Sequence, residues 1–126
     1  MNKRFLWVLG LVMIFAASPV YAGKAMQMWN CGLSDDVSEE AVEAHVSEWL
    51  KAARQVDGGE NIEAFILFPV AVNAMGETDL VFVVTMPTFA EWGKFWDAYP
   101  SSDAAAGEDG PAFCPDSVVW EAVKIK

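Results

Sequence analysis

The sequence predicts an α+β domain in which two strand–helix–strand units follow one another. Apolar residues recur every three or four positions over residues 37–56 and 89–99, which is the spacing of one face of a helix. Four other segments are short and either alternating or continuously apolar, as strands are. These segments are residues 24–31, 62–72, 80–86 and 117–126. The predicted order is therefore strand, helix, strand, strand, helix, strand.

The first strand alternates in polarity and leads into an acidic helix. Met26, Met28 and Asn30 share one face of residues 24–31, and Gln27 and Trp29 lie on the other. A helix over residues 37–56 then begins at either Asp36 or Ser38, because both residue types cap helix N-termini. The glycines at 58 and 59 end it.

The second helix carries the clearest local signals. Thr88 and Glu91 form a T-x-x-E capping box, and Pro100 prevents continuation beyond residue 99. Gly93 lowers helix stability by about 1 kcal/mol relative to Ala, so we interpret it as a point where a backbone or a large ring approaches closely. Four aromatic residues form one stripe along this helix: Phe89, Trp92, Trp96 and Tyr99.

The two middle strands are apolar on both faces, which requires cover on both sides. Pro69 places the end of the second strand at a sheet edge or bulge, because proline has no N–H to donate. Residues 101–115 contain two glycines and two prolines and are predicted to be a long loop. Such a loop is either a lid over a binding site or a mobile connection.

This element order is typical of the ferredoxin-like split βαβ arrangement. We predict a four-stranded antiparallel sheet with strand order 4-1-3-2 and two helices on one face, and we expect only the central pair to be parallel. Cys31 ends the first strand and Cys114 precedes the last, so the topology brings both to the same end of the sheet. We predict a Cys31–Cys114 disulfide, which would stabilise the fold by about 4 kcal/mol.

Residues 1–22 have the layout of a secretory signal peptide. Lys3 and Arg4 precede a 13-residue apolar run, and small residues then lead to predicted cleavage after Ala22. An apolar run of 13 is shorter than the ~20 residues that span a bilayer, so we predict no stable membrane insertion after cleavage. The predicted location is the periplasm or outside the cell. Residues 23–126 are expected to form a single domain.

The charge of the chain argues against several classes of function. The formal net charge is −10, and it becomes −12 without Lys3 and Arg4. Such a surface repels phosphate backbones, so we predict no nucleic-acid partner. The sequence contains one His and no C-x-x-C motif, and no metal site is predicted. It also lacks a glycine-rich phosphate loop and a G-x-S-x-G motif.

Two helices cover only one face of a four-stranded sheet, although the strands are apolar on both faces. An uncovered apolar face predicts a homodimer in which two sheets face one another. With its element order and aromatic second helix, the chain resembles the dimeric α+β barrel superfamily. That superfamily includes the antibiotic-biosynthesis monooxygenases, the stress-responsive A/B-barrel proteins and the NIPSNAP-like group.

The resemblance directs attention to three residue types. Haem-degrading monooxygenases of this superfamily use an Asn, a Trp and a His, which Asn30 and Trp92 or Trp96 match by type. His45 lies in the first predicted helix, whereas the family's ligand belongs to a later helix, and we predict no cofactor. His45 is therefore a weak candidate for a general base, and ordinary solvation on the helix flank is the favoured interpretation.

The other candidates have two interpretations each. Asn30 either orients a ligand carbonyl or lies at the solvated end of its strand, and we favour the second. The aromatic stripe is either core or a wall against which a ligand stacks, and core is favoured. Catalytic roles are thus unknown, with Asn30, His45 and Trp92 as weak candidates. The candidate ligand-binding residues are Met28, Asn30, Trp92 and Trp96.

Three hypotheses of function follow. The first is a secreted or periplasmic protein that binds a small apolar or aromatic molecule between sheet and helices. The second is a cofactor-independent enzyme similar to the monooxygenases named above. The third is a non-catalytic dimeric interaction protein. Nothing in the sequence identifies a ligand or establishes that the protein is an enzyme.

Overall fold

The computed structural model describes residues 23–71, 76, 78–107 and 109–126. The predicted signal peptide and its cleavage site lie outside the described residues. The elements are β1 (Lys24–Leu33), α1 (Glu39–Ala53), β2 (Glu63–Leu67), β3 (Leu80–Met86), α2 (Phe89–Ala98), η1 (Tyr99–Ser101), α3 (Asp103–Ala106) and β4 (Ala112–Ala122).

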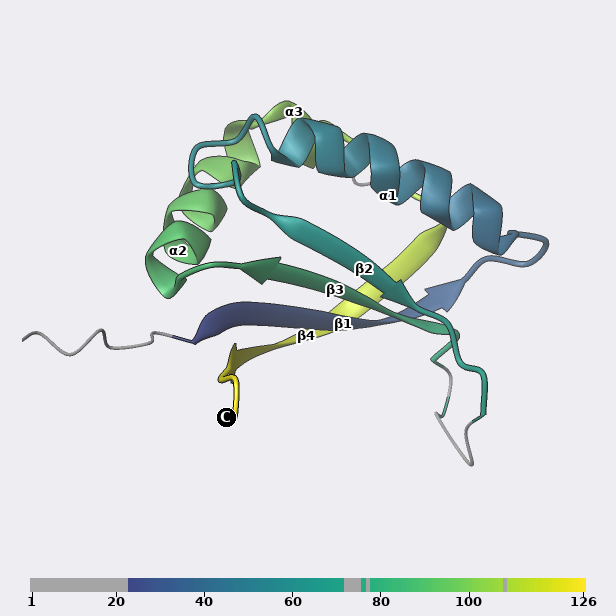
Figure 1. Ribbon diagram of the computed structural model, residues 1–126. Coiled ribbons are helices and arrows are strands. Elements are labelled where there is room, and N and C mark those ends of the chain that lie inside the picture. The colour runs from purple at the N-terminus through teal and green to yellow at the C-terminus, as the bar shows by residue number, and fades with distance from the viewer. Residues whose placement is uncertain (1–22, 72–75, 77, 108) are drawn as a thin grey trace, which may run out of the picture.

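The predicted fold is confirmed. The strands form one sheet in the order β2-β3-β1-β4, which is 4-1-3-2 read from the other edge. The helices cover one face of the sheet and leave the other face open (Figure 1). The expectation of a parallel central pair was wrong, because β1 and β3 run antiparallel. The hairpin reverses β3 relative to β2, and the α1 crossover leaves β1 and β2 in the same direction.

Several element boundaries differ from the prediction. β2 ends at Leu67, before Pro69, so the apolar run is longer than the strand. β4 begins at Ala112 instead of residue 117. The predicted loop over residues 101–115 therefore contains the start of a strand, and it also contains α3, whose N-cap is Ser102. Alanines 104–106 are good helix formers, which explains this short helix.

Side-chain caps start both long helices. Ser38, one of the two predicted caps of α1, accepts a hydrogen bond of 3.2 Å from the backbone N–H of Ala41. Thr88 caps α2 as predicted and accepts one of 3.1 Å from the N–H of Glu91. The Lys94–Asp57 ion pair ties α2 to the turn after α1 at 2.6 Å. The hydrogen bond and the charge of Asp57 raise the pKa of Lys94.

The core lies between α2, the end of α1 and the sheet. Phe95 is fully buried and packs among Val84 and Met86 of β3 and Ala53 of α1. The interpretation of Gly93 as a close-approach point was wrong, because a Cβ added there would meet nothing within 4 Å.

The turn after α1, and not Gly93, makes the close approach to α2. Gly58 has a φ of 86°, and a Cβ there would lie 2.8 Å from the backbone N of Phe95. The next residue, Gly59, packs against the Phe95 ring. The glycines that ended the predicted helix thus also allow α2 to pack closely.

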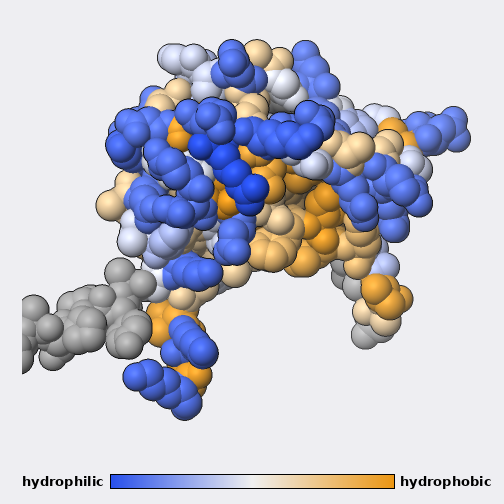
Figure 2. Space-filling view, turned by 45° about the horizontal axis from the view of Figure 1, so that its top comes forward, coloured by the Kyte–Doolittle hydropathy of each residue, from blue (hydrophilic) through white to orange (hydrophobic). Residues whose placement is uncertain are grey.

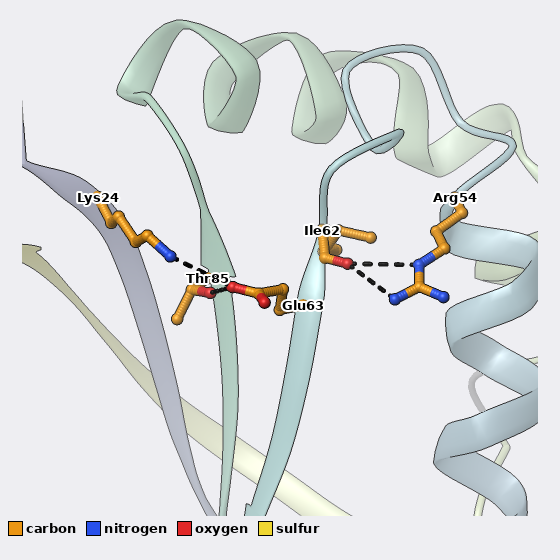
Figure 3. A network of polar contacts seen from close by, with 5 residues as sticks. All are labelled: Lys24, Arg54, Ile62, Glu63 and Thr85. Carbon is orange, nitrogen blue, oxygen red and sulfur yellow. Dashed lines mark hydrogen bonds and ion pairs between the residues drawn. The ribbon is translucent and has the colours of Figure 1, made fainter.

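The open face of the sheet is apolar at its centre and polar at one end. Phe65, Leu67, Val118 and Trp120 are between 48% and 56% exposed on this face. At one end of the face, Glu63 accepts hydrogen bonds from Lys24 at 3.3 Å and from Thr85 at 3.2 Å, which links three strands (Figure 3). The helical layer is mostly hydrophilic, and apolar residues reach the surface below it (Figure 2).

The predicted disulfide is confirmed. Cys31 and Cys114 are joined, with Cα atoms 4.2 Å apart and a sequence separation of 83 residues. A register shift between Asn30 and Gly32 interrupts the pairing of β1 with β4 beside this bond. None of the helices in the described ranges has the length and apolar character needed to cross a membrane.

Candidate functional site

A cavity of about 520 Å³ lies between the helix-covered face of the sheet and α1. Gln27, Trp29 and Phe82 come from the sheet. Trp49 lines the cavity from α1, and the segment from Asp109 to Cys114 lines another part of its wall. The volume falls within the range of small-molecule sites in proteins.

Aromatic rings make up much of the wall. Trp29 stacks on Phe82 with ring centroids 5.3 Å apart. Trp49 meets the same Phe82 ring edge-on at 5.4 Å, and Trp96 lies 5.9 Å from Trp29. These rings come from β1, β3, α1 and α2, so the fold, not one local motif, assembles the aromatic wall.

Hydrogen bonds hold two of the polar aromatic side chains in place. The indole Nε1 of Trp49 donates to the hydroxyl of Tyr99 at 3.0 Å. That hydroxyl in turn donates to the carbonyl oxygen of Ala104 at 3.4 Å. The chain of bonds connects α1, η1 and α3 and fixes the orientation of Trp49.

Trp96 has a buried indole N–H with no hydrogen-bond partner among the described residues. Its ring packs edge-on against Tyr99 at 4.8 Å and against Phe95 at 5.0 Å. Because Nε1 is closed to solvent, a ligand would reach it only after a neighbouring side chain moved. Trp96 therefore offers its ring, and not its N–H, to the cavity.

The sheet forms the floor of the cavity, and Gln27 is a polar residue of this floor that is 9% exposed. Its Oε1 accepts a hydrogen bond of 2.9 Å from the indole Nε1 of Trp92. Its Nε2 donates one of 3.2 Å to the hydroxyl of Ser117. Buried amides need such partners, and these two bonds hold the amide of Gln27 in one orientation.

His45 lines the cavity beside Gly110. A Cβ added to Gly110 would lie 2.5 Å from Nε2 of His45, so the backbone at Gly110 lies against the imidazole. The Cys31–Cys114 disulfide also lines the cavity, and the backbone N–H of Ser34 donates to the carbonyl of Pro111 at 3.3 Å. The cross-link and this bond hold the segment that carries Gly110 in place.

The structure brings together only part of the predicted site. His45 and Trp96 line the cavity. Trp92 is not among the lining residues and contacts the cavity indirectly, through Gln27. Met28 and Asn30 lie on the open face, because Gln27 and Trp29 alternate with them and point towards the helices. Asn30 is exposed, which agrees with the favoured interpretation of a solvated position.

Four residues of the cavity floor and aromatic wall were not among the predicted site residues: Gln27, Trp29, Trp49 and Phe82. The alternation of β1 placed Gln27 and Trp29 together on one face, and a polar residue between apolar neighbours was the available signal. Its partner Trp92 is 65 residues away, and no sequence pattern reveals that pairing. Within the described part of the chain, no three His, Cys, Asp or Glu side chains could together hold a metal ion.

Comparisons with known proteins identify the fold and no closer relationship. No protein-family model matches the chain, and no curated protein matches it. A hypothetical Arabidopsis thaliana protein has a similar structure, with a TM-score of 0.50 and 11% identity, over 83% of this chain and 92% of that one.

Two other solved structures are also similar. A candidate chlorite dismutase matches with a TM-score of 0.50 and 11% identity, over 82% of this chain and 46% of its own. A dimeric ferredoxin-like protein of unknown function from Thermobifida fusca matches with a TM-score of 0.47 and 15% identity, over 79% and 89%. The chain spans less than half the length of the chlorite dismutases that it matches. The sheet topology gives this chain a ferredoxin-like α+β fold, and the two matches with a TM-score of 0.50 show that proteins of distant sequence share it.

Proposed function

We propose that this protein is a secreted or periplasmic binder of a small apolar or aromatic molecule. The observation that carries the proposal is the cavity of about 520 Å³ with its wall of aromatic rings. The pattern of residues 1–22 supports export, and so does the disulfide, because disulfides persist in oxidising compartments.

The cavity wall suits a planar apolar ligand. Trp29 of β1 and Trp49 of α1 both contact Phe82 of β3, and these rings offer stacking and edge-on contacts to an aromatic molecule. The disulfide and the Trp49–Tyr99 hydrogen bond hold this wall before a ligand enters. A preformed site loses less conformational entropy on binding.

The cavity proposal is tested by titration calorimetry with indane, an aromatic hydrocarbon of nine carbons, and with two variants. Ala112 lines the cavity, so Ala112→Trp fills part of it. Ala44 is exposed on α1, so Ala44→Trp makes the same change elsewhere. We expect saturable binding of indane by the wild type and by Ala44→Trp, and at least tenfold weaker binding by Ala112→Trp. Equal affinities in all three proteins, or no binding to any, would contradict the proposal.

We also propose that two copies pair through the open face. The supporting observation is the group of half-exposed apolar side chains on this face: Phe65, Leu67, Val118 and Trp120. Monomeric proteins rarely expose contiguous apolar patches of this kind. A second copy would bring an identical apolar surface, as a twofold interface requires.

A further inference from the structure

One hydrogen-bond donor at the cavity floor has no partner in the part of the chain that the structure describes. The side-chain amide of Gln27 has two N–H groups, and the bond to Ser117 uses one of them. Gln27 is 9% exposed and lines the cavity. One N–H of this amide therefore has no hydrogen-bond partner among the described residues.

Trp92 determines which way the amide points. An indole N–H can only donate, so the atom of Gln27 that lies 2.9 Å from Nε1 of Trp92 must be the amide oxygen. The NH₂ group is then on the side of Ser117, and the amide oxygen of Gln27 already accepts the bond from Trp92. The N–H of Gln27 that Ser117 does not bind is therefore the group that we assign to a ligand.

The charges around the cavity determine the second property of the ligand. No Lys or Arg is among the described lining residues, and Asp109 carries a carboxylate at the wall. The chain as a whole has a net charge of −10. An anionic ligand would be buried without a cationic partner, which is energetically costly. The site therefore disfavours an anionic ligand, and the N–H of Gln27 requires an acceptor atom, which a neutral carbonyl supplies.

We propose that Gln27 is the donor that orients the ligand, and that the ligand is a neutral aromatic molecule with a carbonyl or other acceptor oxygen. The aromatic rings of Trp29 and Phe82 would contact its ring system, and the free N–H of Gln27 would bind its oxygen. Trp92 is a positioning residue, which acts through Gln27. This inference rests on the proposed function, because it requires that the cavity bind a ligand.

The test compares two probes that differ in one oxygen. 1-Indanone is indane with a ketone, so the ratio of their dissociation constants reports on recognition of the oxygen. The two free probes differ in hydration, but this difference is the same for every variant. It therefore cancels when the ratio is compared between variants. Dissociation constants for both probes are measured by calorimetry with the wild type, Gln27→Met, Trp92→Phe and Ser117→Ala. Gln27→Met keeps the length of the side chain and removes both N–H groups.

We expect the preference for 1-indanone to fall about threefold to tenfold in Gln27→Met, as the loss of one hydrogen bond predicts. Trp92→Phe should also reduce the preference, because the amide is then free to turn. Ser117→Ala should keep it, because the NH₂ group remains. In NMR spectra of the wild type, the side-chain amide signal of Gln27 should shift more on addition of 1-indanone than on addition of indane. This readout does not depend on the variants folding.

Two results would overturn the inference in different ways. If both probes bind and the preference is the same in the wild type, Gln27→Met and Trp92→Phe, the inference is wrong and the proposed function stands. If neither probe binds the wild-type protein, the proposed function fails, and the inference fails with it.

Discussion

Trp92 donates a hydrogen bond of 2.9 Å to Gln27 and so connects α2 to β1 across 65 residues of sequence. The contact joins a residue of the aromatic stripe to the polar residue of the cavity floor. It shows that the stripe has two functions. Tyr99 of the stripe is buried in the core, whereas Trp92 holds a polar group at the cavity.

Replacing Trp92 with Phe tests the energetic value of this bond. The change leaves the buried Oε1 of Gln27 without its partner, and we expect a loss of about 1–3 kcal/mol in the free energy of unfolding. Trp96→Phe is the matched control, because it removes an indole N–H that has no partner among the described residues. Urea unfolding measures both. A loss from Trp96→Phe equal to or larger than that from Trp92→Phe would contradict this account.

The Cys31–Cys114 disulfide closes a long loop and should contribute substantially to stability. For a sequence separation of 83 residues, the chain-entropy model gives about 4 kcal/mol, less any strain. The double variant Cys31→Ala, Cys114→Ala should therefore unfold at much lower urea concentration than the oxidised wild type. Reduced wild type is the control and should resemble the variant. Labelling of both thiols without reductant would show that the bond does not form.

Gly93 offers a stabilising substitution. A Cβ at this position meets nothing within 4 Å, and the residue lies inside α2. Gly93→Ala should raise the free energy of unfolding by about 0.5–1 kcal/mol, because Ala has the higher helix propensity. Gly59→Ala is the contrasting variant, since its Cβ would overlap the carbonyl oxygen of Ala53. Destabilisation by Gly93→Ala would mean that another group occupies the space beside α2.

The apolar open face predicts a dimer, and one charged substitution on this face should disrupt it. Val118 lies on this face, and Val118→Glu places a carboxylate in the proposed interface. Val70 is 98% exposed after the end of β2, so Val70→Glu makes the same change outside the sheet. Light scattering after size exclusion should give a dimer mass for the wild type and Val70→Glu and a monomer mass for Val118→Glu. A monomeric wild type at micromolar concentration would contradict the proposed pairing.

Local signals in the sequence predicted the elements that depend on local physics. The T-x-x-E box and Pro100 defined α2 within one residue, because caps and proline act on their own backbone. The disulfide followed from topology alone, since β1 and β4 had to be neighbours.

Features that depend on tertiary contacts were harder to predict from the sequence. Residues 112–116 carry glycine and proline neighbours that indicate a loop, yet β1 extends to Leu33 and gives them a pairing partner. Gly93 was interpreted from its helix propensity, whereas the close contact with α2 is made by Gly58 and Gly59 from another part of the chain. Likewise, the hydrogen-bonding role of Gln27 depends on Trp92 and Ser117, neither of which is near it in sequence.

The indole N–H signals of the tryptophans test most directly whether the cavity is the binding site. Trp29, Trp49 and Trp96 line the cavity, whereas Trp120 lies on the opposite face of the sheet. In an NMR titration of isotope-labelled protein with 1-indanone, we expect saturable shifts of the Trp29 and Trp49 signals and an unchanged Trp120 signal. Shifts of Trp120 with no change at Trp29 and Trp49 would place the ligand on the open face and contradict the account.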